Sequence, residues 1–175
     1  MLNKLSLMGV VIVASALTSF AQAPKDLPPG TYVTPAEMEH ELKTAPNQAA
    51  SLIDRPVRIV RSGDHNIGVA NVKRTSGDKT ALIHDKIDEI YYILEGGGTL
   101  VTGGTVTDAE KSGPSDTIGP GWRGKSIQGG DSRHVGPGEV IFVPAGTPHM
   151  FTSMDGKEVH YLIYRIDPTR VLPTK

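Results

Sequence analysis

The chain has 175 residues and a formal net charge of −1, from 18 lysines and arginines against 19 acidic residues. It has no basic stripe and aromatic residues make up only 5% of it, so its composition does not indicate a nucleic-acid partner. Cysteine is absent, which excludes thiolate zinc sites and cysteine nucleophiles and leaves His, Asp and Glu for any metal site.

Residues 1–23 have the pattern of a signal peptide. Lys4 precedes an apolar run at residues 5–17, and the segment ends in Ala21, Gln22 and Ala23. A basic start, a short apolar core and an A-x-A ending are typical of a leader that is removed on export, and the core is short for a membrane span. We therefore expect a secreted or periplasmic protein with no stable membrane insertion after leader removal. An uncleaved membrane anchor is the alternative.

Residues 24–56 are expected to form an N-terminal arm and a short helix. The arm is rich in proline and glycine as far as Val33. Thr34, Pro35 and Glu37 then supply a hydroxyl cap, a proline at the first helical position and an acid three residues after the cap. This arrangement predicts a helix that ends near Lys43.

From residue 57 the pattern changes to short β-rich runs separated by glycine, aspartate and asparagine. Many short strands with turn residues between them predict an all-β sandwich or barrel. We expect it to occupy residues 57–166 and to be followed by a polar tail at residues 167–175. The expected strands are residues 57–61, 67–74, 80–84, 89–94, 99–102, 140–143 and 159–166.

A glycine-rich tract at residues 103–138 is predicted to be one long loop, which is either functional or mobile. It contains Arg123, Arg133 and the only tryptophan, Trp122. A lone tryptophan is more often a packing anchor than a surface on which a substrate lies.

The stretch GEVIFVPAGTPH, residues 138–149, predicts a strand, a sharp turn and a histidine at the start of the next strand. Val, Ile and Phe favour the strand, Pro144 ends it, and Gly146 can adopt a positive φ in the turn. We therefore expect His149 to be held by a rigid turn. The question is what this imidazole faces.

A second stretch, LIHDKIDEIYYILEG, supplies partners for His149. Side chains alternate along a strand, so Leu82 and His84 share one face and Glu89 and Tyr91 share a face of the next strand. Two imidazoles and one carboxylate could then meet inside a barrel. This set suits a divalent metal such as Fe, Mn, Ni or Zn and leaves positions open for water or substrate.

Other acids and histidines are given different roles. Asp85 or Asp88 could add a ligand from the corner between the two strands, or be a solvated turn residue. The remaining histidines are expected to lie on the surface or in hydrogen bonds; they are His40, His65, His134 and His160.

The sequence resembles the cupin superfamily, and in particular small single-domain secreted cupins of type 2. Four residues meet the second cupin motif, GxxxxxPxGxxH: Gly138, Pro144, Gly146 and His149. Three meet the first motif, HxHxxxxE followed by a glycine: His84, Glu89 and Gly96. Leu82 stands where this motif has its first histidine, and Ser153 where an asparagine commonly follows the second.

The resemblance covers roughly residues 57–166 and implies a cupin-type double-stranded β-helix, or jelly-roll, barrel that is often a homodimer. It implies metal ligands at His84, Glu89 and His149, which are three instead of the usual four. Tyr91, Arg123 and Arg133 are candidates to bind an anionic or hydroxylated substrate. No catalytic residue is assigned.

Three functions agree with this set of residues. The first is an exported, metal-dependent enzyme of the oxygenase, isomerase or lyase type acting on a small molecule. The alternative is a non-catalytic cupin that binds a sugar or another small molecule and has a degenerate metal site. A structural or assembly protein is a third, because a fold alone does not define a function.

Overall fold

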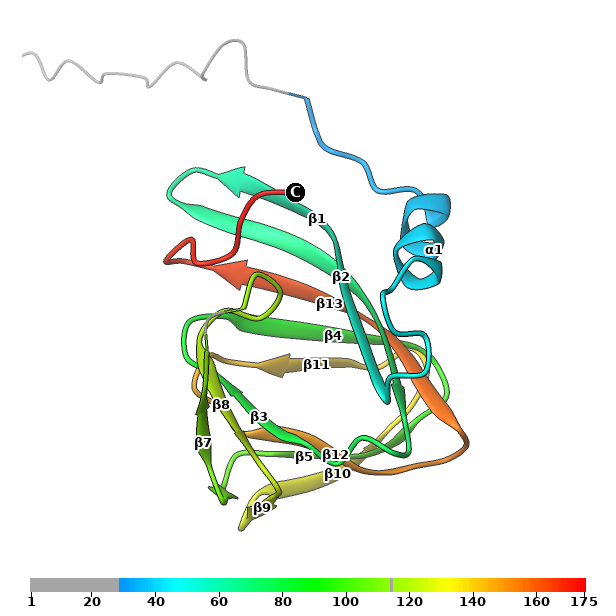
Figure 1. The fold of residues 1–175 in the computed structure, drawn as a ribbon, viewed down its shortest axis with the longest axis vertical. Coiled ribbons are helices and arrows are strands. Elements are labelled where there is room, and N and C mark those ends of the chain that lie inside the picture. Colours follow the sequence, from blue (N-terminus) through cyan, green and yellow to red (C-terminus); the bar gives the residue numbers. More distant parts are fainter. Residues whose placement is uncertain (1–28, 114) are drawn as a thin grey trace, which may run out of the picture. The chain divides into compact units, whose positions relative to one another are not determined.

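The computed structural model describes residues 29–113 and 115–175 (Figure 1). The predicted leader, residues 1–23, lies outside these ranges. No helix in the described ranges is long and apolar enough to cross a membrane.

The predicted helix is present as α1, Pro35–Lys43. Its capping box is complete, because Glu37 N donates to Thr34 Oγ1 at 3.3 Å and Thr34 N donates to Glu37 Oε2 at 2.8 Å. The helix packs against the first two strands of the barrel.

The other regular elements of residues 29–113 and 115–175 are strands. Their bounds are β1 Leu52–Ser62, β2 His65–Thr75, β3 Ala81–His84, β4 Asp88–Glu95, β5 Gly98–Thr102, β6 Thr105–Thr107, β7 Glu110–Ser112, β8 Gly121–Gly124, β9 Ser126–Gln128, β10 Asp131–Val135, β11 Val140–Val143, β12 His149–Met154 and β13 Glu158–Asp167.

Within the described ranges these strands form two large antiparallel sheets and one small one. The five-stranded sheet has the order β1-β2-β13-β4-β11, the six-stranded sheet has the order β10-β5-β12-β3-β8-β7, and β6 pairs with β9. The large sheets form two layers (Figure 1). Inner residues of both sheets, among them Tyr91, Tyr161 and Phe151, share one buried core. The predicted all-β fold, with antiparallel sheets packed in two layers and a short N-terminal helix, is confirmed.

Strand β1 starts earlier than predicted, at Leu52 instead of residue 57. Its pairing with β2 is irregular between Pro56 and Arg58. Proline has no N–H to donate to the ladder, and the strand accommodates it with this irregularity instead of ending. The strand therefore runs through Pro56 and begins five residues before the predicted start.

The prediction of one long loop at residues 103–138 is wrong. The tract contains β6 to β10, and three of these strands extend the six-stranded sheet. Its glycines mark the turns: Gly103 and Gly104 have φ values of 75° and 74°, which favour glycine. The strands are only three to five residues long, too short to show an alternation of polar and apolar residues.

The polar tail packs against the barrel. Asp167 is the last residue of β13, and its Oδ2 accepts a hydrogen bond from Leu172 N at 2.8 Å. The Leu172 side chain is buried beside Ile59. Lys175 N donates to Ile59 O at 2.9 Å, so the end of the chain lies along β1.

Candidate metal centre and its cavity

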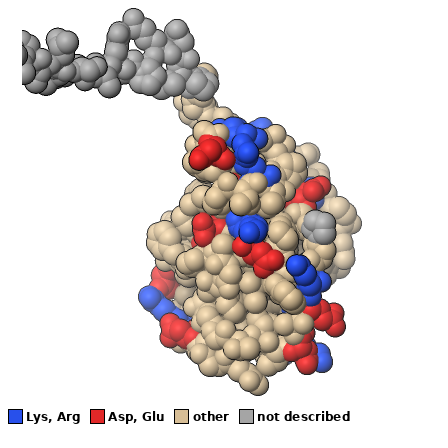
Figure 2. Space-filling model, turned by 90° about the vertical axis from the view of Figure 1, so that its left-hand side faces the viewer, with Lys and Arg blue, Asp and Glu red and all other residues tan. Residues whose placement is uncertain are grey.

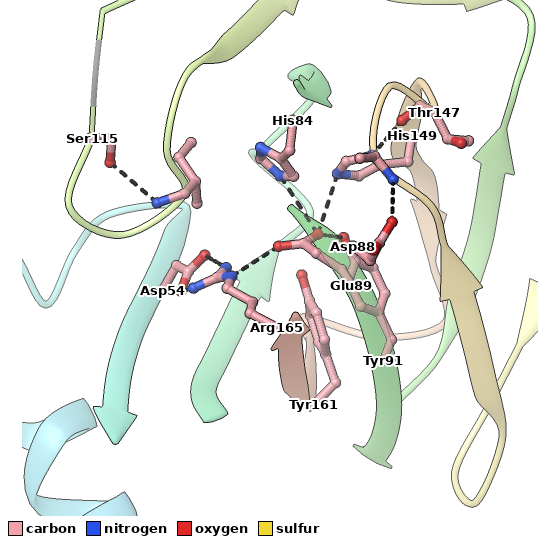
Figure 3. Close-up of polar contacts among 12 residues, drawn as sticks. Asp54, His84, Asp88, Glu89, Tyr91, Ser115, Thr147, His149, Tyr161 and Arg165 are labelled. Carbon is pink, nitrogen blue, oxygen red and sulfur yellow. Dashed lines mark hydrogen bonds and ion pairs between the residues drawn. The ribbon is translucent and has the colours of Figure 1, made fainter. Parts of the chain in front are cut away.

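The barrel brings the three predicted ligands together (Figure 3). His84 Nε2 lies 3.5 Å from Glu89 Oε2, and His149 Nε2 lies 3.8 Å from the same oxygen. All three side chains are buried, and one ligand atom from each lies within 4.8 Å of the others. A group of this kind is compact enough for a single metal ion.

The two sheets contribute different ligands. His84 ends β3 and His149 begins β12, which are neighbours in the six-stranded sheet, whereas Glu89 comes from β4 in the facing sheet. The turn before His149 is fixed to β3, because Gly146 N donates to His84 O at 2.8 Å. Gly146 has a φ of 80°, as the sequence predicts for this turn.

His149 is oriented as a metal ligand would be. Its Nδ1 lies 3.0 Å from the carbonyl oxygen of Thr147, and since a carbonyl only accepts, Nδ1 carries the proton. The lone pair is therefore on Nε2. That atom is buried and has no hydrogen-bond partner among the described residues. A buried polar atom without a partner requires an explanation, and a metal ion at Nε2 provides one.

Glu89 is held in place on both sides. Its Oε1 accepts from Arg165 Nε and its Oε2 accepts from the Tyr91 hydroxyl, each at 2.9 Å. Arg165 in turn donates from its NH1 atom to Asp54 at 3.1 Å. Burial opposes the ionisation of Glu89, but attraction to His84 in its protonated form, to Arg165 and to His149 in its protonated form outweighs burial and lowers the pKa of Glu89 to about 2. The carboxylate is thus charged and rigid.

Both imidazoles are neutral at neutral pH. Burial lowers the pKa of His84 to about 4 and also lowers the pKa of His149, although Glu89 opposes the shift in each case. Burial, followed by the charge of Glu89, raises the pKa of Tyr91 well above its usual value of 10. Tyr91 therefore remains a hydrogen-bond donor, and both histidines are in the form that binds metal.

Leu82 leaves the group with three ligands. Its side chain is buried in the cavity wall, on β3 directly opposite His149 on β12. Neither aspartate of the corner replaces it, since the described group contains only His84, Glu89 and His149. Asp88 instead accepts a hydrogen bond from Ala145 N at 2.8 Å and holds the turn before His149.

A cavity of about 470 Å³ reaches the group from one side. His84 and Tyr91 lie in its wall, together with Leu82, Arg123 and the segment that contains Ser115, Thr117 and Ile118. The volume is within the range of small-molecule sites. A ligand of modest size can therefore lie beside His84.

The structure brings two of the three predicted substrate-binding residues to this cavity. Tyr91 and Arg123 are in its wall, although the Tyr91 hydroxyl is engaged with Glu89. Arg133 is not brought there: it lies on β10, pairs with Glu139 at 2.9 Å and borders a different hollow. Arg123 and Arg133 lie in different places because their strands have different neighbours. Arg123 is on β8, which pairs with β3, whereas Arg133 is on β10, which pairs with β5.

Sequence reasoning missed the residues that support Glu89. Arg165 lies on β13 and shares the inner face with Tyr161 and Ile163. An arginine in the alternating inner positions of an apolar strand was a visible signal that a buried charge needed a partner. The partner itself could not be read from the sequence.

The other histidines lie where they were expected. His134 is exposed and lies 2.9 Å from Asp155, and His65 lies 3.1 Å from Asp64. His160 Nε2 lies 2.6 Å from Asn71 Oδ1, and His40 is exposed on α1. Figure 2 shows basic and acidic side chains interspersed on one face of the molecule.

Three solved structures are similar to this chain at 16% to 24% sequence identity. No protein-family model and no curated protein matches the chain. A solved structure from Bacillus halodurans is 19% identical, covers 83% of this chain and 88% of its own, and has a TM-score of 0.46. The polyketide cyclase RemF from Streptomyces resistomycificus is 24% identical, with coverages of 66% and 65% and a TM-score of 0.42. DMSP lyase DddQ from Ruegeria pomeroyi is 16% identical, with coverages of 74% and 55% and a TM-score of 0.42. These values say nothing about the ligand or the reaction of this chain.

Proposed function

We propose that this chain is an exported cupin-type protein that binds a divalent metal through His84, Glu89 and His149 and acts on a small molecule. The observation that carries the proposal is the buried, unpartnered Nε2 of His149 beside His84 Nε2 and Glu89 Oε2. A neutral imidazole pair with one carboxylate suits Fe, Mn, Ni or Zn. Export rests on the leader pattern of residues 1–23.

When bound, the metal supplies a Lewis acid with open positions for substrate oxygens. The chain's own residues hold and shield this site. Arg165 and Tyr91 fix the orientation of Glu89, and Leu82 provides an apolar wall next to His84. Arg123 lies in the wall and has no acidic partner within 4.0 Å among the described residues, so it is free to attract an anionic substrate.

The alternative is a binding protein without catalytic activity. Leu82 favours it, because a site with one imidazole fewer binds metal less strongly. The cavity would then hold a sugar or another small molecule, and the metal would be bound weakly or not at all. Oxygenase, isomerase and lyase reactions remain the candidate classes if the site is catalytic.

The test begins with residues 24–175, reconstituted separately with iron, manganese, nickel and zinc and examined by elemental analysis. We expect about one metal ion per chain with at least one of the four metals. Activity on diols, keto acids and sugars is then compared under air and under nitrogen, and a requirement for O₂ identifies an oxygenase. A chain that takes up none of the four metals refutes the proposal. Metal uptake with ligand binding but without turnover supports the alternative.

We also propose that a second copy of the chain covers the outer face of the five-stranded sheet. Phe142, Ile90, Tyr164 and Val69 form one row across β11, β4, β13 and β2. Phe142 is 70% exposed and Tyr164 is 44% exposed. The row carries no charge, so two identical rows can face each other around a two-fold axis without repulsion.

Light scattering during size exclusion is expected to give the mass of a homodimer. Phe142→Asp should shift it toward the monomer, because the substitution places a charge at the most exposed position of the apolar row. Val171→Asp is the control, since Val171 is exposed and apolar but is not part of the row. A parent chain that is monomeric at high concentration, or a Phe142→Asp variant that stays dimeric, contradicts this proposal.

A further inference from the structure

Arg74 lies in the wall of the same cavity and has unused hydrogen-bond donors. It is 4% exposed; its Nε donates to the Tyr161 hydroxyl at 3.3 Å, and its NH1 atom donates to Asp78. Its guanidinium lies over the ring of Phe151, with the central carbon 5.9 Å from the ring centre. A guanidinium has five N–H donors, and the described residues accept from only two of its N–H groups. The fork is thus held rigidly, with donors left for a ligand in the cavity.

The charges around the cavity also favour an anion. Three arginines are balanced by three acids in the cavity wall and the metal-binding group; they are Arg74, Arg123, Arg165, Asp54, Asp78 and Glu89. A bound divalent metal then gives this region an excess of two positive charges. A ligand with a carboxylate reduces this excess in a poorly solvated space, where the attraction is strong.

The position of Arg74 defines the form of such a ligand. Thr80, Leu82 and His84 lie along one side of the cavity, and Asp78, the partner of Arg74, accepts from Thr80 N at 3.2 Å. Thr80 and His84 are four strand positions apart, which is a distance of about 13 Å. Because the Arg74 side chain is long, the distance that a ligand must span between its guanidinium and His84 is shorter than this. Leu82 lies between Thr80 and His84. This side of the cavity is therefore polar at both ends, at Thr80 and His84, and apolar between them.

We propose that Arg74 is an anion-binding residue and that the ligand is a small organic acid. Its carboxylate binds Arg74, and an oxygen at its other end reaches the group of His84, Glu89 and His149. The inference rests on the proposed function for the second contact. The competing explanation is that Arg74 and Asp78 form an ion pair that only stabilises the turn between β2 and β3.

The test is isothermal titration calorimetry on the full chain loaded with metal. The probes are ω-hydroxycarboxylates with three to eight carbons, each compared with the diol of the same length. We expect at least one acid to bind roughly tenfold or more tightly than its diol, which is the usual contribution of a hydrogen bond to a charged group. Arg74→Gln should remove this preference and leave the metal content unchanged. Arg133→Gln is the matched control, since that arginine is exposed and lies outside the cavity.

Asp78→Asn separates binding from a purely structural role. It keeps the oxygen that accepts from Thr80 N and removes the carboxylate that competes for Arg74, so the affinity for the acid should rise several-fold. If the ion pair of Arg74 and Asp78 has only a structural role, Asp78→Asn should not increase the affinity for the acid. The inference is overturned if the parent binds acids and diols equally well, or if Arg74→Gln keeps the preference for acids. If Arg74→Gln does not fold, the affinity of Asp78→Asn for the acid decides whether Arg74 binds the carboxylate. A parent without metal contradicts the proposed function instead, and the same titrations on it still test Arg74.

Discussion

His149→Ala is expected to weaken metal binding by more than about a hundredfold, because changes to residues that merely support a ligand already cost 10- to 100-fold. His149 has its Nδ1 proton engaged with Thr147 O, so its Nε2 lone pair has no role in the described structure except toward a ligand. His84→Ala should have a similar effect. Elemental analysis after dialysis against metal-free buffer measures the change.

His134→Ala is the matched control. His134 is an exposed histidine that pairs with Asp155 and lies outside the metal-binding group, so its removal should leave the metal content unchanged. If the His84 and His149 variants retain as much metal as the control, the metal is bound somewhere else and the assignment of these ligands is wrong.

Acid should release the metal in the same way as these substitutions. Protonation competes with the metal only as the pH approaches the pKa of the folded imidazole, which burial lowers to about 4 for His84. The pKa of His149 is also lowered. We therefore expect the metal content to be constant from pH 8 to about 5 and to fall steeply near pH 4. Full retention well below pH 4 would exclude histidine ligation.

Arg165→Met is expected to lower the free energy of unfolding of the metal-free protein by about 3 to 5 kcal/mol. Arg165 neutralises a buried acid, Glu89, and a partly buried one, Asp54, and the substitution leaves both without a cation. The pKa of Glu89 should rise, since Arg165 is one of the charges that lower it. Denaturation by urea at pH 7 in the presence of a chelator measures the loss.

Arg133→Met tests whether the effect is specific to burial. Arg133 also pairs with a glutamate, Glu139 at 2.9 Å, but 73% of its side chain is exposed. Exposed pairs contribute about 1 kcal/mol or less, so this variant should be nearly as stable as the parent. A similar loss of unfolding free energy in both variants would mean that burial of Arg165 is not the cause of the effect. Recovery of stability by Arg165→Met in combination with Asp54→Asn and Glu89→Gln would support the stated cause.

The strand and turn around His149 were predictable because their signals are local. Val140–Val143, Pro144 and Gly146 lie next to one another, and each has a strong backbone preference. The short strands between Gly103 and Gly138 were not predictable for the opposite reason. Some of them are stabilised by pairing with distant strands, such as β8 with β3, and each is too short for alternation to identify it as a strand.

The sequence by itself determined the fold class and the three candidate metal ligands, because side-chain alternation along strands and one rigid turn specify which way His84, Glu89 and His149 point. Only the tertiary structure decided what surrounds them. Arg165 bonds to Glu89 and Asp54, which lie 76 and 111 positions away in the chain. Contacts over such separations depend on which strands become neighbours, and strand order also places Arg74 and Arg123 in the cavity while Arg133 stays outside.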